Sequence, residues 1–335
     1  MLARKLRSAK FAEYLSTYAI LHHIGIHETT LIEKRDSGTD FGVYVRDACD
    51  ADTTLLVIPS KRFAAVSTIA RLGAPVRLVA ADACQAVFRS LDAGLVAYLC
   101  GSCSSQQWVE WCWRVALEKH RGYSPLWGWL QSLPTPEAYQ EERDHVDQHC
   151  RLHHPSVYPF FQSAQRKIEA EVRTAYEALA RDNLMPSFDV FHWAVAVLLT
   201  RGIPVPTAWP PRPHAADAEA PGIEPAVVPY VDLMNGADGA PRRANAELEV
   251  ARSMDELPRW YTSWVTAEGV LKGTMEPEKV LPTLLEQYYF LCVVLRKPLR
   301  ASEEVLVAYQ SPFIETEVLS EEDGELLSRF VKYLF

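Results

Sequence analysis

The sequence predicts an α+β protein, in which a β-rich module of several small sheets carries a helical insert. Near the N-terminus, short runs rich in β-branched residues alternate with turn residues and predict strands at 26–32, 42–45 and 53–58. From about residue 82 to residue 199, apolar residues recur at helical spacing instead. Strands first and helices afterwards are typical of a segregated α+β arrangement and not of a doubly wound sheet.

The helical region divides into five expected helices. They cover 86–98, 106–120, 136–153, 162–182 and a buried segment at 188–199. Ser105 and Ser187 stand where a hydroxyl would cap the start of a helix. Further along, 247–250 and 261–265 supply strand or helix material. The continuous apolar run at 284–295 fits either, because it has no decisive period.

Residues 204–229 form a proline-rich segment. It contains eight prolines between short polar residues and alanines. Proline has no backbone N–H to donate, so we expect neither a helix interior nor a central strand here. The segment is predicted to be an exposed loop, partly of polyproline type, which orders only against a partner.

Composition limits the classes of partner. A formal net charge of −9 argues against a protein that binds nucleic acid over its whole surface. We expect contact with nucleic acid only indirectly or through local basic patches. No run reaches the roughly 20 apolar residues of a membrane-spanning helix, and we expect no membrane contact. The seven cysteines are scattered, as in a reducing compartment. Cys100 and Cys103 have the spacing of half a zinc site, but no second pair answers them.

The first residues are basic and contain no acid before Glu13. Arg4, Lys5, Arg7 and Lys10 stand among leucine, alanine and serine, a composition typical of a mitochondrial presequence. An exposed amphipathic helix is the alternative. We therefore expect a mitochondrial protein, and otherwise a cytoplasmic one.

Three histidines lie on one face of the helix predicted at 136–153. His145, His149 and His153 are spaced i, i+4 and i+8, with Cys150 and His154 nearby. This spacing would allow two adjacent turns to hold a metal ion. Because the stretch is mostly charged and polar, a solvated face is the favoured interpretation, and no metal is predicted.

Two segments about seventy residues apart carry a family resemblance. They are Val228-Pro-Tyr-Val-Asp-Leu-Met-Asn235 and Glu303-Glu-Val-Leu-Val-Ala-Tyr309. Together they resemble the C-terminal half of a SET domain, the fold of S-adenosylmethionine-dependent protein methyltransferases. Over residues 24–319 the order of segments is similar to the Rubisco large-subunit methyltransferase class, whose C-terminal substrate-binding domain is lacking here. The resemblance implies a β-rich SET fold with a knotted C-terminal segment.

The same resemblance implies a division of the chain. Its parts would be a basic N-terminal helix at 1–25, an N-terminal SET half at 26–81, a helical insert at 82–185, a C-terminal SET half at 186–319 that includes the proline-rich loop, and a tail at 320–335.

The resemblance also implies the cofactor contacts. Phe41 and Gly42 match the second half of a Gly-x-Gly motif whose backbone lies along the methionine part of the cofactor, with Asp40 in place of the first glycine. Arg201 ends a buried helix where the family pairs an arginine with the cofactor carboxylate. Asn235 keeps the amide that contacts the cofactor. Without the resemblance, Arg201 reads as a helix C-cap and Asn235 as part of a turn.

Two residues would carry the catalysis that the resemblance implies. Tyr309 matches the tyrosine that orients the substrate amine and helps to deprotonate it, and Asp232 falls near the lysine pocket. Tyr309 could otherwise be a core tyrosine.

Several family features differ in this chain. Gly236 replaces a histidine, Asp40 replaces a glycine, and no Tyr-Gly-Phe follows Tyr309. We therefore expect a weakened or silent SET domain that binds protein partners as a structural, assembly or interaction subunit, for instance of a mitochondrial ribonucleoprotein, and that needs no cofactor. The alternative is an active protein-lysine N-methyltransferase that uses S-adenosylmethionine.

Overall fold

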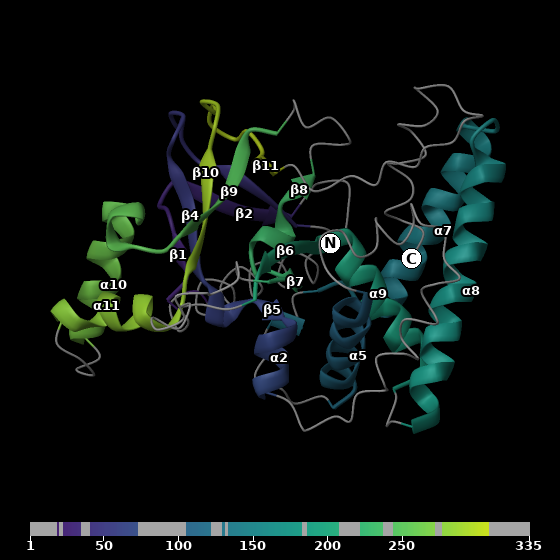
Figure 1. Cartoon of the computed structure of the whole chain (residues 1–335). Helices are drawn as coiled ribbons and strands as arrows, with labels where there is room; N and C mark the ends of the chain where they lie inside the picture. Colours follow the sequence, from purple (N-terminus) through teal and green to yellow (C-terminus); the bar gives the residue numbers. More distant parts are fainter. Residues whose placement is uncertain are drawn as a thin grey trace, which may run out of the picture. The chain divides into compact units, whose positions relative to one another are not determined.

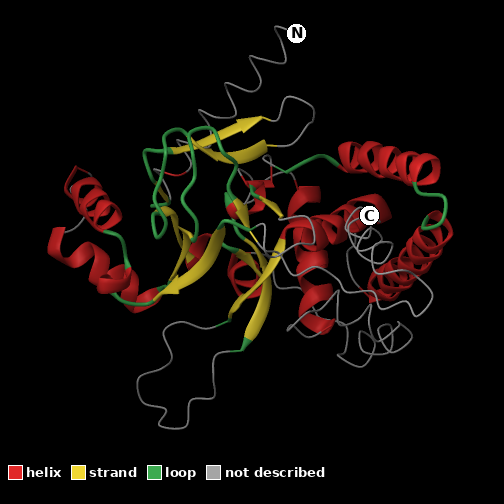
Figure 2. Cartoon of the chain, turned by 90° about the horizontal axis from the view of Figure 1, so that it is seen from above, coloured by secondary structure: helices red, strands yellow, loops and turns green. Residues whose placement is uncertain are grey.

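The structure is a computed structural model that describes residues 19, 23–34, 41–72, 105–121, 129–130, 133–182, 186–207, 222–236, 244–271 and 277–307. The chain forms two compact units. The first comprises the described residues within Met1–Phe63, Pro206–Gly222 and Pro229–Tyr309. The second comprises those within Ala64–Val205 and Ile223–Val228. Figure 2 shows helices and strands in the chain by colour.

The first unit is built on a six-stranded sheet with the order β1-β4-β10-β9-β11-β8. In Figure 1, β4, β10 and β9 run side by side in this sheet. A separate antiparallel pair is formed by β2 and β3. The strands of this unit are β1 Gly25–Ile26, β2 Thr30–Lys34, β3 Phe41–Val45, β4 Thr54–Pro59, β8 Asn235–Gly236, β9 Ala246–Ala251, β10 Phe290–Leu295 and β11 Leu306–Val307.

Two helices cover apolar residues of this sheet. They are α10 Arg259–Leu271 and α11 Pro277–Gln287, and short 3-10 turns lie at η1 Ser60–Arg62, η2 Val231–Leu233 and η4 Met254–Glu256. Tyr261 of α10 is fully buried against Val57, Phe290 and Cys292. Its hydroxyl donates to the carbonyl of His23 at 2.8 Å, which satisfies the one polar atom of this side chain inside the core.

Backbone hydrogen bonds connect two loops from opposite ends of the first unit's sequence. Cys49 and Leu299 exchange N–H and carbonyl groups at 2.9 Å in both directions. The amide of Ser302 donates to the carbonyl of Val45 at 2.7 Å, and that of Val305 donates to Val43 at 2.8 Å. The loop after β10 is therefore joined along its length to β3 and the loop that follows it.

The second unit combines a small sheet with helices. Its elements are β5 Ala64–Ala65, α2 Val66–Leu72, α5 Ser105–Arg121, α7 Pro136–His153, α8 Tyr158–Asp182, α9 Phe188–Arg201, β6 Gly202–Pro206 and β7 Ile223–Val227, with the sheet order β5-β7-β6. The buried carboxylate of Glu224 accepts hydrogen bonds from the amide of Ser67 at 2.7 Å and from its hydroxyl at 2.5 Å. This acid on β7 thus caps the first turn of α2.

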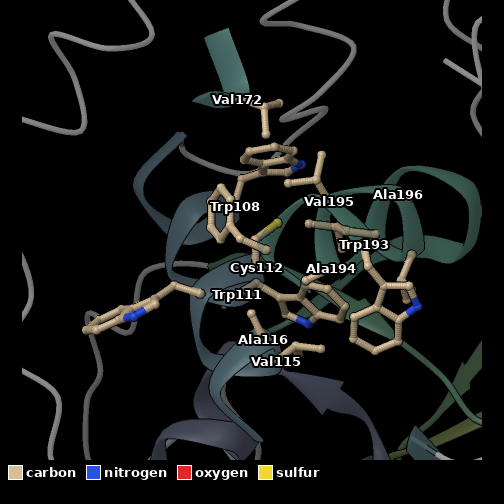
Figure 3. Packing of buried hydrophobic residues seen from close by; sticks show 14 of the residues in the cluster. Trp108, Trp111, Cys112, Val115, Ala116, Val172, Trp193, Ala194, Val195 and Ala196 are labelled. Carbon is tan, nitrogen blue, oxygen red and sulfur yellow. The ribbon is translucent and has the colours of Figure 1, made fainter. Parts of the chain in front are cut away.

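Tryptophans dominate the core of the second unit. Trp108, Trp111 and Trp113 of α5 are buried with Trp193 of α9. Figure 3 shows Trp108, Trp111 and Trp193 with Val195 and other small residues of α9. Two indole N–H groups donate to backbone carbonyls, that of Trp111 to Ala64 and that of Trp193 to Pro134 at 2.8 Å. The aromatic rings therefore fill the core without leaving these two donors unsatisfied.

The predicted α+β class with several small sheets is confirmed, and most predicted elements lie within a few residues of their observed bounds. The helix predicted at 136–153 is α7, where Thr135 accepts from the amide of Ala138 at 3.3 Å as an N-cap. The run at 284–295 is helix and strand in succession, since α11 ends at Gln287 and β10 begins at Phe290. The segment predicted at 261–265 is helical. The helix predicted at 86–98 and the N-terminal segment at 1–18 lie outside the described residues.

The proline-rich segment 204–229 was wrongly predicted to be loop throughout. Pro204 and Pro206 belong to β6, and Pro225 lies in β7, the middle strand of its sheet. The pairing of β7 with β5 involves only Ala226 and Val227, so the missing N–H of Pro225 leaves no gap in that ladder. Residues 208–221, between the two strands, are outside the described part.

No helix among the described residues is long and apolar enough to cross a membrane.

Gly25 is predicted to tolerate no side chain. A Cβ there would lie 2.3 Å from Cδ2 of Tyr261, whose buried ring is held by its bond to His23. We expect Gly25→Ala to reduce the free energy of unfolding by about 1–3 kcal/mol through overpacking. Thermal and urea denaturation measure this. Gly222→Ala is the matched control, because that exposed glycine meets only the side chain of Thr207, and equal stability of the two variants would contradict the packing described.

His192 on α9 predicts a pH dependence. Its pKa is lowered to about 4, mainly by burial and next by the positive charge of Arg143, with a smaller contribution from Arg173. The negative charges of Glu169 and Asp189 act in the opposite direction but do not offset the burial. The unfolded chain takes up this proton near pH 6.5 and the folded chain only near pH 4, so stability falls as the pH drops through that window. We expect a loss of at most about 3 kcal/mol, measured by urea denaturation from pH 7 to pH 4.5. His192→Gln is expected to flatten this slope and His120→Gln to leave it unchanged; identical slopes in all three proteins would contradict the burial of a neutral imidazole.

Candidate cofactor site

Strand β3 places Phe41 and Gly42 at the start of the β2–β3 pair. Phe41 is opposite Lys34 and Gly42 is opposite Glu33. Val43 and Val45 point into the core with no exposed surface, so the strand is fixed by burial as well as by pairing. Strand β3 also contacts η2, the short turn that carries Asp232. The sequence-predicted glycine and aspartate therefore lie on neighbouring elements.

The space beside Gly42 is filled by the protein's own side chains. A Cβ at this position would lie 2.8 Å from Cε2 and 2.9 Å from the hydroxyl of Tyr44, and 3.0 Å from Oε1 of Glu304. Tyr44 and Glu304 also form an isolated antiparallel bridge. A larger residue at this position would have to displace the ends of these two side chains, which occupy the volume it would need.

Asp232 lies in a buried and strained turn. Tyr230, just before it, has φ 72° and ψ −37°, a left-handed conformation that costs a non-glycine residue about 1–3 kcal/mol. Tyr230 and Asp232 are 1% and 3% exposed. A buried carboxylate next to strained backbone is typical of functional sites, and it is the strongest local feature of the segment that begins at Val228.

Asn235 and the segment that leads to Tyr309 lie side by side. Strand β8 pairs with β11 in parallel, with Asn235 opposite Leu306 and Gly236 opposite Val307. The two segments that carry the family resemblance are thus adjacent although seventy residues separate them. Tyr309 itself lies outside the described residues, as do Asp40 and the side chains of Phe41 and Asn235.

The side chain of Asn245 fixes the course of the second segment. Its amide nitrogen donates to the carbonyl of Glu304 at 2.8 Å, and its amide oxygen accepts from the backbone of Leu306 at 2.8 Å. The backbone of Asn245 donates to Leu306 and accepts from Arg296 at 3.0 and 2.8 Å. Asn245 is 8% exposed, so these bonds are protected from water. This residue positions the strand immediately before Tyr309.

Arg201 belongs to the second unit, where it ends α9. Its Nε donates to the hydroxyl of Tyr139 on α7 at 3.1 Å. That hydroxyl also lies 3.3 Å from Oγ1 of Thr200, whose hydroxyl in turn donates to the carbonyl of Ala196 at 2.7 Å. Within the described residues, Arg201 therefore has a hydrogen-bond partner in the second unit itself, the phenol of Tyr139.

The structure brings together four of the six predicted site residues. Phe41, Gly42, Asp232 and Asn235 lie on adjoining elements of the first unit, whereas Arg201 lies in the second and Tyr309 is not described.

Sequence reasoning missed three residues at or near these positions. They are Tyr44, Tyr139 and Asn245. A single tyrosine or asparagine gives no signal in a sequence, because its partners are distant in the chain.

No metal centre is evident in the described parts of the chain. Within these ranges no group of three or more histidines, cysteines or acids is placed to hold a metal ion. The pair Cys100 and Cys103, half of a zinc-site pattern, lies outside them.

Comparison with known proteins gives limited information. No family model matches the chain, and no curated protein matches it. Among the solved structures that match, three share 14–15% identity with this chain over 90% of its length. They are the SET domain of LSMT bound to lysine and AdoHcy (TM-score 0.47) and the same domain bound to methyllysine and AdoHcy (TM-score 0.42). The third is Rubisco LSMT bound to sinefungin and monomethyllysine (TM-score 0.37).

This chain covers 52–54% of those structures, or about half of their length. Such identities and TM-scores assign neither a ligand nor a substrate to this chain.

Asn245 is predicted to be essential for the stability of the first unit. In Asn245→Asp one oxygen can still accept from Leu306, but a carboxylate oxygen would face the carbonyl of Glu304, which loses its donor. We expect a loss of about 1–3 kcal/mol in the free energy of unfolding at pH 7. Urea denaturation measures it, with Gln148→Glu, at an exposed position of α7, as the amide-to-acid control. A loss no larger than that of the control would contradict the bridging role.

Proposed function

We propose that this chain is a SET-type protein of the Rubisco large-subunit methyltransferase class with a weakened or silent methyltransferase site, and that it serves as a structural, assembly or interaction subunit of a larger complex. The observation that carries the proposal is the packing around Gly42. A cofactor that lies along this backbone needs the space that Tyr44 and Glu304 now fill.

The position of Glu304 adds a cost of displacement. Its Oε1 lies 3.0 Å from the position of a Cβ on Gly42. A cofactor that needs this space has to move Glu304 out of its contacts, which costs free energy and lowers affinity for the cofactor.

The arginine expected to hold the cofactor carboxylate has an internal contact. Its Nε donates to Tyr139. A bidentate grip on a carboxylate uses two N–H groups of the guanidinium, and a grip that includes Nε requires this contact to be given up. This supports reduced affinity independently of Gly42.

The role as a subunit is inferred from composition. Proteins are the favoured partners, because the net charge of −9 disfavours general contact with nucleic acid, which would be met indirectly or through local patches. The basic residues before Glu13 favour a mitochondrial location, with a ribonucleoprotein as the host complex.

An active protein-lysine N-methyltransferase is the second candidate. The parallel pairing of Asn235 with Leu306 favours it, since this pairing holds the two SET-like segments together, and Asp232 is buried beside strained backbone. In that case Phe41, Gly42, Arg201 and Asn235 would bind S-adenosylmethionine. Tyr309 would orient a lysine amine, with Asp232 near the lysine pocket, and the amine would take the methyl group in line from the sulfonium.

Calorimetric titration of the full chain with S-adenosylmethionine distinguishes the two candidates. The silent-site proposal predicts no binding tighter than a Kd of about 1 mM, because Tyr44 and Glu304 occupy the space beside Gly42. Arg181→Ala, which changes an exposed arginine of α8, serves as a control for charge alone. Micromolar binding that is lost in Arg201→Ala and in Asn235→Ala, but kept in Arg181→Ala, would refute the proposal and favour the second candidate.

A further inference from the structure

The end of α7 and the residue that follows it contain four histidines within ten residues. They are His145, His149, His153 and His154. The ring centroid of His149 lies 4.6 Å from that of His153 and 5.6 Å from that of His154. The i, i+4 spacing of His149 and His153 places both imidazoles on one face, one helical turn apart. This face of α7 is exposed to solvent, as the sequence predicted. The imidazole rings of His149 and His153 are nevertheless in contact with each other on it.

The carboxylate of Asp147 on α7 is engaged beside this group, since it accepts from the hydroxyl of Tyr158 on α8 at 3.3 Å. Imidazole nitrogens, which supply a lone pair when the ring is neutral, are the donors that the exposed face offers to a metal ion.

We propose that His149 and His153 form a two-imidazole binding site for a borderline divalent metal ion such as Zn²⁺. Two histidines one turn apart on a helix are a recurring means of holding zinc, and imidazole is a preferred ligand of this ion. No third ligand from the described residues joins them, so water or a donor from another molecule completes the tetrahedral shell.

The alternative ligands nearby are poor. The thiol of Cys150 lies on the same turn, but it is fully buried in the core of the second unit, whereas the imidazoles of His149 and His153 are exposed. The site is thus formed by imidazoles at the surface, open to solvent and to a partner.

Titration of the full, metal-free chain with Zn²⁺ at pH 7.5, followed by calorimetry, tests this site. We expect one equivalent to bind, and His149→Ala and His153→Ala each to weaken binding by about tenfold or more. His120→Ala, which removes an exposed histidine of α5, and the double variant Cys100→Ser/Cys103→Ser should bind as the wild type does.

A second measurement separates this site from adventitious binding. A metal ion that bridges one turn of α7 binds the folded chain only, so Zn²⁺ should raise Tm in the wild type and not in His149→Ala. Wild-type affinity in both His149→Ala and His153→Ala, or loss of binding only in the double cysteine variant, would overturn the proposal. These outcomes are independent of whether S-adenosylmethionine binds.

Discussion

The first unit depends on one set of backbone hydrogen bonds, those between residues 295–306 and three other parts of the chain. Leu299 and Cys49 bond to each other in both directions, and Val305 bonds to Val43. Asn245 bonds to this segment through both its side chain and its backbone. A segment from the end of the described chain is thereby placed between strands from its beginning and middle. Because such contacts are distant in sequence, they form only when the whole unit folds.

The same bonds decide what surrounds Gly42. With the backbone of residues 303–305 fixed beside β3, the side chain of Glu304 is directed to Gly42, where it meets Tyr44. The parallel contact of Leu306 with Asn235 follows from the same placement. The same backbone hydrogen bonds therefore hold these segments together and place Glu304 beside Gly42.

The elements were more predictable from sequence than the site. Residues 136–153 have a proline start, a threonine cap and clear helical spacing, all of them local signals, and the observed bounds match. Pro225 was wrongly excluded from a central strand, because its neighbours Ala226 and Val227 alone make the ladder to β5. The roles of Asn245, Tyr44 and Tyr139 depend on partners from distant parts of the chain, so no local pattern could reveal them.

The central claim is that the protein's own side chains take the place of the cofactor beside Gly42. A crystal structure determined after soaking with saturating S-adenosylhomocysteine tests it most directly. We expect Tyr44 and Glu304 to stay beside Gly42 and no ligand density to lie along β3. Ligand density along Phe41 and Gly42, with Tyr44 and Glu304 displaced, would contradict it.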